Sequence, residues 1–230
     1  MICPMLDWGV GEYEQTAVEL EPVAELVVDM ARLSPGEGVI DLACGTGNAA
    51  LLAAERGARV IGIDGAGRLI QVARQRAREQ RLEVDFLDGN LLHLPLREAA
   101  ADVVISVFGV IFASDPVAGL REVPRVAPGP PANRFPWYDP DALAPVARAA
   151  GLELRSTQAS TLAIRGSSPE AYLTRARLDP RAVATAPIIE RAGVQDEVQE
   201  AMSAVLRDAN EDPDAFLVHT PDVVHEFAVA

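Results

Sequence analysis

The chain has 230 residues, of which 49% are hydrophobic and 23% are charged, and it carries a formal net charge of −14 at pH 7. This length and composition are typical of a globular protein with a sizeable core. The acidic charge argues against a nucleic-acid partner, because binding a phosphate backbone requires a concentrated positive surface.

The sequence also gives no sign of a metal site or a membrane span. Its two cysteines, Cys3 and Cys44, are too few for a disulfide framework or a zinc site. No run approaches the ~18 apolar residues that a transmembrane helix needs. The first residues lack the basic start and apolar core of a signal peptide. We therefore expect a cytoplasmic protein without a metal ion and without a membrane partner.

The first half of the chain alternates between helical and strand patterns. Helices are expected where apolar residues recur at helical spacing, and strands where short runs are continuously apolar. The alternation, with strands that are apolar throughout, predicts a mostly parallel, doubly wound sheet of the α/β class. The expected helices span residues 16–33, 48–55, 68–81 and 116–126, and the expected strands span residues 39–43, 59–63, 82–87 and 101–107.

The alternation breaks after residue 126. A fifth parallel strand should follow, but residues 127–142 read APGPPANRFPWYDPDA. Prolines cannot donate to a central ladder, so we predict that this strand is missing. We hypothesise that roughly two to three dozen residues are absent between Ala127 and Phe135; the alternative is a genuine deletion that alters the acceptor pocket.

Beyond the break, the pattern predicts a different arrangement. A helix is expected at 140–150, capped by Gly151, and two strands of an antiparallel edge at 152–156 and 161–165. Residues 169–210 are expected to be mostly helical, and residues 216–229 to form a last strand or a hairpin. The fold class is therefore α/β with an antiparallel C-terminal edge and a helical lid.

The segment VIDLACGTGN, residues 39–48, places a glycine turn between the first strand and the next helix. In a doubly wound sheet, ligands bind beyond the carboxyl ends of the strands, where the strand order reverses. Gly45 and Gly47 permit positive φ and a close approach of the backbone to a ligand. Asp64, which ends the second strand, is suited to hold both hydroxyls of a ribose.

A nicotinamide-dependent oxidoreductase would share this plan, but two features argue against it. The dinucleotide fingerprint has a third glycine three residues after the second, and Ala50 stands there. Asp41 precedes the turn and fits a cationic group better than a pyrophosphate. Ala50 matches only the permissive form of the fingerprint, and Asp41 favours a cationic group such as an amino-acid ammonium or a sulfonium.

At these residues the chain resembles the class I S-adenosylmethionine-dependent methyltransferases. VIDLACGTGNAALLAAERGARVIGID is similar to the first two motifs of the family, LDGNLLHLPL to the third and ADVVISVFGVIFASDP to the fourth. WGVGEYEQTAVELEPVAELVV is similar to the N-terminal helix of a bacterial small-molecule subgroup. The resemblance implies one Rossmann-like domain over residues 1–230, with 8–126 as the cofactor-binding half and 135–230 as the C-terminal half.

The resemblance further implies that S-adenosyl-L-methionine is the cofactor and that its methyl group passes to a small organic acceptor by in-line displacement. Asp41 would face the ammonium group, and Asp64 would hold the ribose. Asn90 would accept from the adenine amino group where the family usually has Asp, unless Asp88 takes that role. The implied cofactor-binding residues are Tyr13, Asp41, Ala43, Gly45, Gly47, Asp64, Gly65, Gly89, Asn90, Ser106 and Phe108, with Tyr13 and Trp8 in a lid.

Several assignments have alternatives. Asn90 fits a loop about as well as an adenine contact, and Cys44 is interpreted as a buried filler, since no histidine partner is visible. His93 and His219 are candidates for a general base only because histidine titrates near neutrality. The segment near His219 and His225 fits either a lid or a homodimer contact. A protein that binds S-adenosylmethionine without methylating is a further alternative.

Overall fold

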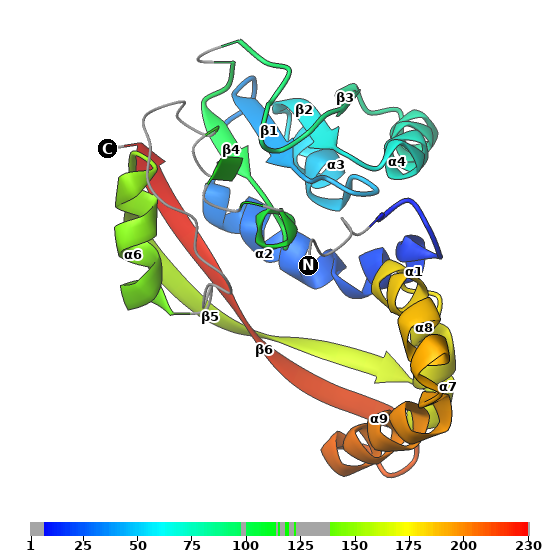
Figure 1. The fold of residues 1–230 in the computed structure, drawn as a ribbon. Helices are drawn as coiled ribbons and strands as arrows, with labels where there is room; N and C mark the ends of the chain where they lie inside the picture. The colour runs from blue at the N-terminus through cyan, green and yellow to red at the C-terminus, as the bar shows by residue number, and fades with distance from the viewer. Residues whose placement is uncertain are drawn as a thin grey trace. The chain divides into compact units, whose positions relative to one another are not determined.

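The computed structural model describes residues 7–97, 100–113 and 139–229, together with residues 115, 118, 119 and 122. The chain divides into two compact units (Figure 1). One unit, called here the helical unit, contains Met1–Leu20 and Thr161–Pro221, and the other, called the sheet unit, contains Glu21–Ser160 and Asp222–Ala230.

The sheet unit is built on four parallel strands in the order β3-β2-β1-β4. The strands are β1 (Gly38–Leu42), β2 (Arg59–Asp64), β3 (Val84–Asp88) and β4 (Val103–Ile105). The predicted parallel sheet is confirmed, and its strands lie within two residues of the expected starts and ends. The strand order reverses at β1, because β2 and β3 follow on one side of it while β4 pairs on the other.

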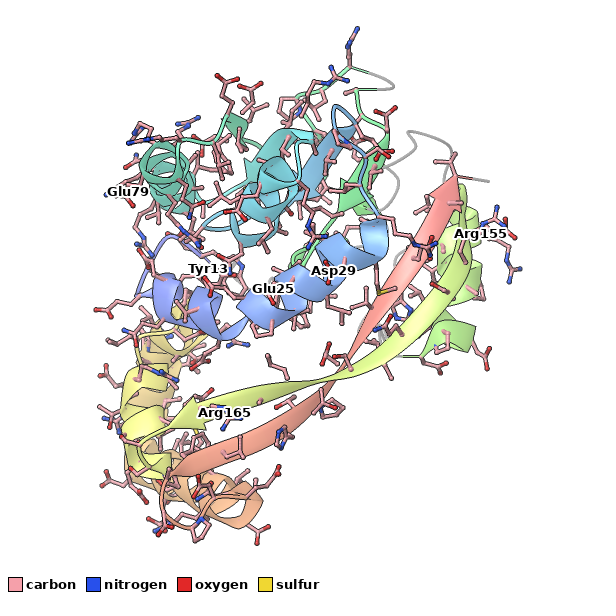
Figure 2. All side chains as sticks on the ribbon, turned by 180° about the vertical axis from the view of Figure 1, so that it is seen from behind. Tyr13, Glu25, Asp29, Glu79, Arg155 and Arg165 are labelled. Atoms are coloured by element: carbon pink, nitrogen blue, oxygen red, sulfur yellow. The ribbon has the colours of Figure 1, made fainter. Side chains whose placement is uncertain are left out.

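Three helices cover one face of this sheet (Figure 1). They are α2 (Glu21–Ala31), α3 (Asn48–Glu55) and α4 (Gly67–Gln80). The helix α2 is amphipathic: its Val28 is fully buried, whereas Glu25 and Asp29 lie on its exposed side (Figure 2). Burial of such apolar side chains stabilises the fold by about 1.5–3 kcal/mol each.

The opposite face of the sheet has its own apolar cluster. Ile40, Leu42 and Ile63 are buried there against apolar side chains of the loop that follows β3. Because side chains alternate along a strand, Val39 and Asp41 point to the face that carries the helices, and Val39 packs in that core. The side chain of Asp41 therefore lies on the helix-covered face of the sheet because of the alternation along β1.

The sheet unit also contains the helix α6 (Pro140–Ala149). Asp139 caps this helix by accepting from the backbone N–H of Asp141 at 3.0 Å. Gly151 follows at φ +76°, as expected for a helix C-terminus. A short 3-10 helix, η1 (Val110–Phe112), follows β4. Residues 118, 119 and 122 are helical, within the helix expected at 116–126. The predicted gap between Ala127 and Phe135 lies outside the described residues.

A separate sheet is formed by β5 (Leu152–Gly166) and β6 (Phe216–Val229). The strands are antiparallel, with Ser156 bonded to Glu226 and Thr157 to His225. The prediction of two short strands at 152–156 and 161–165 is wrong, because no glycine or proline interrupts the residues between them. β6 is likewise a single strand that tolerates Pro221, since both strands of a two-stranded sheet are edges.

The helical unit contains α1 (Tyr13–Glu19), α7 (Pro169–Ala176), α8 (Pro180–Ala192) and α9 (Gln195–Ala209). The helical prediction for 169–210 is confirmed. The single helix expected at 16–33 is instead two, α1 and α2, with Pro22 in the first turn of α2, where a missing N–H costs nothing. Thr16 of α1 donates through Oγ1 to Asp179 Oδ2 at 2.9 Å, which ties α1 to the start of α8.

Within the ranges that the structure describes, no helix is both long and apolar enough to cross a membrane. In the same ranges, no group of three or more histidine, cysteine or acidic side chains is arranged to hold a metal ion.

Candidate functional site

The carboxyl ends of β1, β2 and β4 converge on the glycine turn that follows β1. The turn has positive φ at Ala43 (54°), Gly45 (55°) and Gly47 (86°). The N–H of Gly47 donates to Cys44 O at 2.8 Å, and the N–H of Cys44 donates to Ile63 O at 3.0 Å. A Cβ on Gly47 would also lie only 3.0 Å from the ring of Phe86. Glycine at 47 is therefore required by both conformation and packing.

Asp64, the last residue of β2, is buried beside this turn. Its Oδ2 accepts the N–H of Gly45 and its Oδ1 accepts the N–H of Ala66, both at 2.8 Å. Burial raises the pKa of its carboxyl group, while these two amide bonds oppose the shift. Each carboxylate oxygen can accept a second hydrogen bond. Asp64 therefore fixes the turn and still retains acceptor capacity for a ligand hydroxyl.

Asp41 is 2% exposed and lies on the side of β1 that faces α3. The backbone N–H of Ala50 hydrogen bonds to its carboxyl group, but Oδ2 has no partner among the described residues. Burial raises the pKa of Asp41 to about 8; the amide of Ala50 opposes the rise, and the charge of Asp64 adds to it. A buried polar atom without a partner is costly. The site thus offers a buried acceptor that a donating or cationic ligand would satisfy.

The loop after β4 closes directly on the glycine turn. Ser106 donates through Oγ to Leu42 O at 2.8 Å, and Phe108 has a φ of +56°. A Cβ on Gly109 would fall 2.3 Å from the Cβ of Ala43. Ser106 and Gly109 therefore hold the ends of β1 and β4 together, and Gly109 is a site residue that our sequence analysis missed.

The glycines after β2 and β3 differ in what surrounds them. A Cβ on Gly89 would lie 2.8 Å from Cγ2 of Ile63, so packing explains that glycine. A Cβ on Gly65 would meet only Gly89 O, at 3.7 Å. Gly65 is exposed and has a negative φ, so neither packing nor conformation requires glycine there. An open space beside Asp64 is what a bound nucleoside would need.

An acidic side chain, Asp88, ends β3, and an amide side chain, Asn90, follows it. Asn90 Oδ1 accepts the N–H of Leu92 at 2.9 Å, which is the local turn that the loop interpretation expects. The same oxygen has a second lone pair, so an adenine contact stays a prediction. Oδ1 of Asp88 lies 3.0 Å from the position that a Cβ on Gly67, the first residue of α4, would occupy.

The remaining candidate residues are distributed over both units. Tyr13, labelled in Figure 2, belongs to the helical unit, where its ring packs edge-on against Trp8 with centroids 5.8 Å apart. His219 lies in the same unit, with Nδ1 2.8 Å from Glu211 Oε2, and this bond lowers the pKa of Glu211. His93 is exposed, and its N–H donates to Asn90 O at 3.0 Å. The roles of all three stay predictions.

Cys44 and Arg76 complete the surroundings of the turn. Cys44 is 8% exposed and packs in the apolar core, and burial raises the pKa of its thiol well above the usual value. This agrees with a buried filler and not with an activated nucleophile.

Arg76 of α4 donates to Thr46 and Asn48. Arg76 was not among the residues predicted from the sequence, because an arginine within a helix carries no signal of a distant contact.

Residues 39–128 match the family model described as a methyltransferase domain. Over these residues the chain is similar to that family. The resemblance drawn from the sequence motifs is thereby confirmed, and the matched segment contains the glycine turn, Asp64 and Ser106.

Curated relatives match about half of the chain. An uncharacterised protein of Mycobacterium tuberculosis is 37% identical over 132 residues, which cover 56% of this chain and 48% of the relative. Demethylmenaquinone methyltransferase of Thermus thermophilus is 41% identical over 105 residues, 44% of this chain and 48% of the relative. The chain thus spans about half the length of the curated relatives it matches.

Solved structures share the fold over more of the chain. YcgJ of Bacillus subtilis has a TM-score of 0.61 and 18% identity, covering 90% of this chain and 98% of that chain. The [4+2]-cyclase SpnF has a TM-score of 0.55 and 22% identity, covering 87% of this chain and 80% of that chain. Because SpnF is described as a cyclase, the fold alone assigns no reaction.

Proposed function

We propose that this protein is an S-adenosylmethionine-dependent methyltransferase that acts on a small organic acceptor. The observation that carries the proposal is the position of Asp64. Its carboxylate accepts the backbone N–H of Gly45 in the glycine turn, within a segment that matches a methyltransferase domain. When bound, the cofactor supplies a methyl group already activated by its sulfonium. The protein then has to hold the cofactor and the acceptor in line and exclude water.

Asp64 and Gly65 would hold the nucleoside. The free lone pairs of the Asp64 carboxylate would accept the two ribose hydroxyls, and the open space at Gly65 would admit the adenine edge. Gly89 and Asn90 would border the base on the side of β3. Because Asp64 also anchors Gly45, ribose binding and the shape of the turn would depend on the same carboxylate.

Asp41 would receive the cationic end of the cofactor. Its Oδ2 is buried without a partner among the described residues, and a ligand ammonium group would complete its hydrogen bonding, either directly or through water. Ala43, Gly45 and Gly47 would line the methionine portion through their backbone. Ser106 and Phe108, at the end of β4, would border the transferred methyl group.

A small organic acceptor is supported by two observations. The net charge of −14 disfavours a nucleic acid, and the Thermus thermophilus relative is named for demethylmenaquinone. If the acceptor is a phenol or an alcohol, a general base within hydrogen-bond reach would be needed. His93 and His219 are the candidates from the sequence, and Tyr13 is the candidate for a lid residue over the cofactor.

Calorimetric titration of the ligand-free protein tests the cofactor. We expect S-adenosylhomocysteine to bind and NAD not to bind. Asp64→Ala should weaken S-adenosylhomocysteine binding at least about tenfold, which is about 1.4 kcal/mol. Asp85→Ala, on the exposed side of neighbouring β3, is the matched control and should bind like the wild type. Binding of NAD in place of S-adenosylhomocysteine would support the oxidoreductase alternative.

Methyl transfer is tested separately with a panel of phenols, amines and polyketide-like acceptors. Formation of S-adenosylhomocysteine together with a product 14 mass units heavier, the mass of CH₂ in place of hydrogen, would identify the acceptor class. Tight S-adenosylhomocysteine binding without methylation of any acceptor would instead support a protein that binds the cofactor for another purpose.

A further inference from the structure

Arg76, within α4, reaches the glycine turn with its guanidinium group. Nη1 donates to Thr46 O at 3.0 Å, to Thr46 Oγ1 at 3.2 Å and to Asn48 Oδ1 at 2.6 Å. Nη2 lies 3.5 Å from Oε1 of Glu21, the first residue of α2. The side chain of Arg76 is 27% exposed, and Thr46 is buried. One arginine therefore connects the turn both to α4 and to the start of α2.

These bonds fix one peptide plane of the turn at both of its ends. The peptide between Thr46 and Gly47 has its carbonyl oxygen held by Arg76 and its N–H held by Cys44 O. Gly47, at φ +86°, has no Cβ to restrict its backbone. Without Arg76, this peptide would lose the partner of its oxygen and would be held only through its N–H.

A second peptide of the turn is restrained in the same way. The peptide between Cys44 and Gly45 is also held at both ends, since Cys44 O accepts one bond and Gly45 N–H donates to Asp64. Between the two fixed peptides lies the N–H of Thr46, which has no protein acceptor among the described residues. Its direction is therefore set by its neighbours.

We propose that Arg76 is a positioning residue for the cofactor, which holds the glycine turn in the conformation that presents the Thr46 N–H. The inference rests on the proposed function. Arg76 acts on the turn from the α4 side, so its removal should weaken cofactor binding more than it slows the reaction of bound cofactor. Hydrogen bonds from a charged donor are stronger than those between neutral groups, so the loss of all three bonds should weaken cofactor binding measurably.

The test compares three variants in the full chain. Arg76→Ala removes all the bonds, Arg76→Lys keeps the charge but not the planar fork of donors, and Arg78→Ala removes an exposed arginine from the same helix as a matched control. Calorimetry measures the Kd for S-adenosylhomocysteine, and amide hydrogen exchange of ligand-free protein follows Gly47. With an acceptor in hand, KM for the cofactor and kcat are measured separately.

We expect Arg76→Ala to raise the Kd about tenfold and to speed exchange at Gly47 by a similar factor, with Arg76→Lys intermediate and Arg78→Ala unchanged. kcat at saturating cofactor should change less than about threefold. A folded Arg76→Ala with wild-type Kd, or one no weaker than Arg78→Ala, would overturn the inference. If Arg76→Ala does not fold, Arg76→Lys with wild-type Kd and Gly47 exchange would do the same. A wild type that does not bind S-adenosylhomocysteine would overturn the proposed function itself.

Discussion

The backbone N–H of Gly45 donates to Oδ2 of Asp64 at 2.8 Å, and this bond joins the turn after β1 to the end of β2. Asp64 also accepts the N–H of Ala66 at the entrance to α4. A single buried carboxylate therefore organises the two loops that meet at the switch in strand order. The residue proposed to hold the ribose also shapes the turn beside it, so ligand binding and local stability are coupled at Asp64.

Asp64→Asn should destabilise the ligand-free protein by about 1–3 kcal/mol. The amide group replaces one acceptor oxygen by a donor, so one of the two backbone N–H groups loses its partner while it stays buried. Urea unfolding of the wild type and the variant measures the difference. Asp85→Asn, exposed on β3, serves as the control and should stay within about 0.5 kcal/mol of the wild type. Equal stabilities of all three proteins would contradict a structural role for Asp64.

The stability of the ligand-free protein should depend on pH through Asp41. Burial raises its pKa from 3.8 to about 8 in the folded chain, whereas the unfolded chain loses this proton near pH 4. Between these values the folded state binds more protons, so the free energy of unfolding falls as pH rises. Below about pH 4 and above about pH 8 the contribution is constant.

Asp41→Asn removes this titration. The stability of the variant relative to the wild type should therefore increase by up to the order of 5 kcal/mol between about pH 4 and pH 8. Asp64 and the Cys44 thiol, which are coupled to Asp41 electrostatically, are present in both proteins. Urea unfolding at a series of pH values provides the measurement. Parallel curves for the two proteins would show that Asp41 is ionised in the fold.

Gly109→Ala should disturb the site through packing alone. Gly109 has φ −77°, which any residue adopts, but a Cβ there would fall 2.3 Å from the Cβ of Ala43 and 2.9 Å from Leu42 O. The two loops would have to separate, at a cost of about 1–3 kcal/mol. We expect lower thermal stability and weaker S-adenosylhomocysteine binding. Gly119→Ala, whose Cβ would have ordinary contacts beginning at 3.9 Å, is the matched control.

Asp179→Asn should loosen the attachment of α1 to α8 in the helical unit. Asp179 caps α8, pairs with Arg181 and accepts from Thr16, and these bonds lower its pKa despite burial. Its contribution is present above the unfolded pKa and is lost as pH falls through the lower folded value. We expect a loss of about 1–3 kcal/mol at pH 7 that shrinks in acid. Asp208→Asn, exposed on α9, is the control; equal losses in both variants at every pH would contradict the prediction.

The sequence by itself determined the features that depend on local pattern. Continuous apolar runs indicated the parallel strands, and the glycines at 45 and 47 with Asp64 indicated where a nucleoside would bind. The strand prediction is confirmed because strand burial is set by neighbouring residues, whereas the nucleoside site at Asp64 stays a prediction. The same local reasoning divided β5 in two, since it gave weight to polar residues that a strand at the edge of a sheet accepts readily.

Only the tertiary structure showed what holds the site in place. Arg76 reaches Thr46 across 30 positions and Ser106 reaches Leu42 across 64, and no periodicity within a short window contains such a pair. Gly109 is required by a clash with Ala43, which exists only once β1 and β4 lie side by side. Asp41 gains its raised pKa from burial under α3. Packing brings distant residues to one edge of the sheet, and there it sets both their geometry and their protonation.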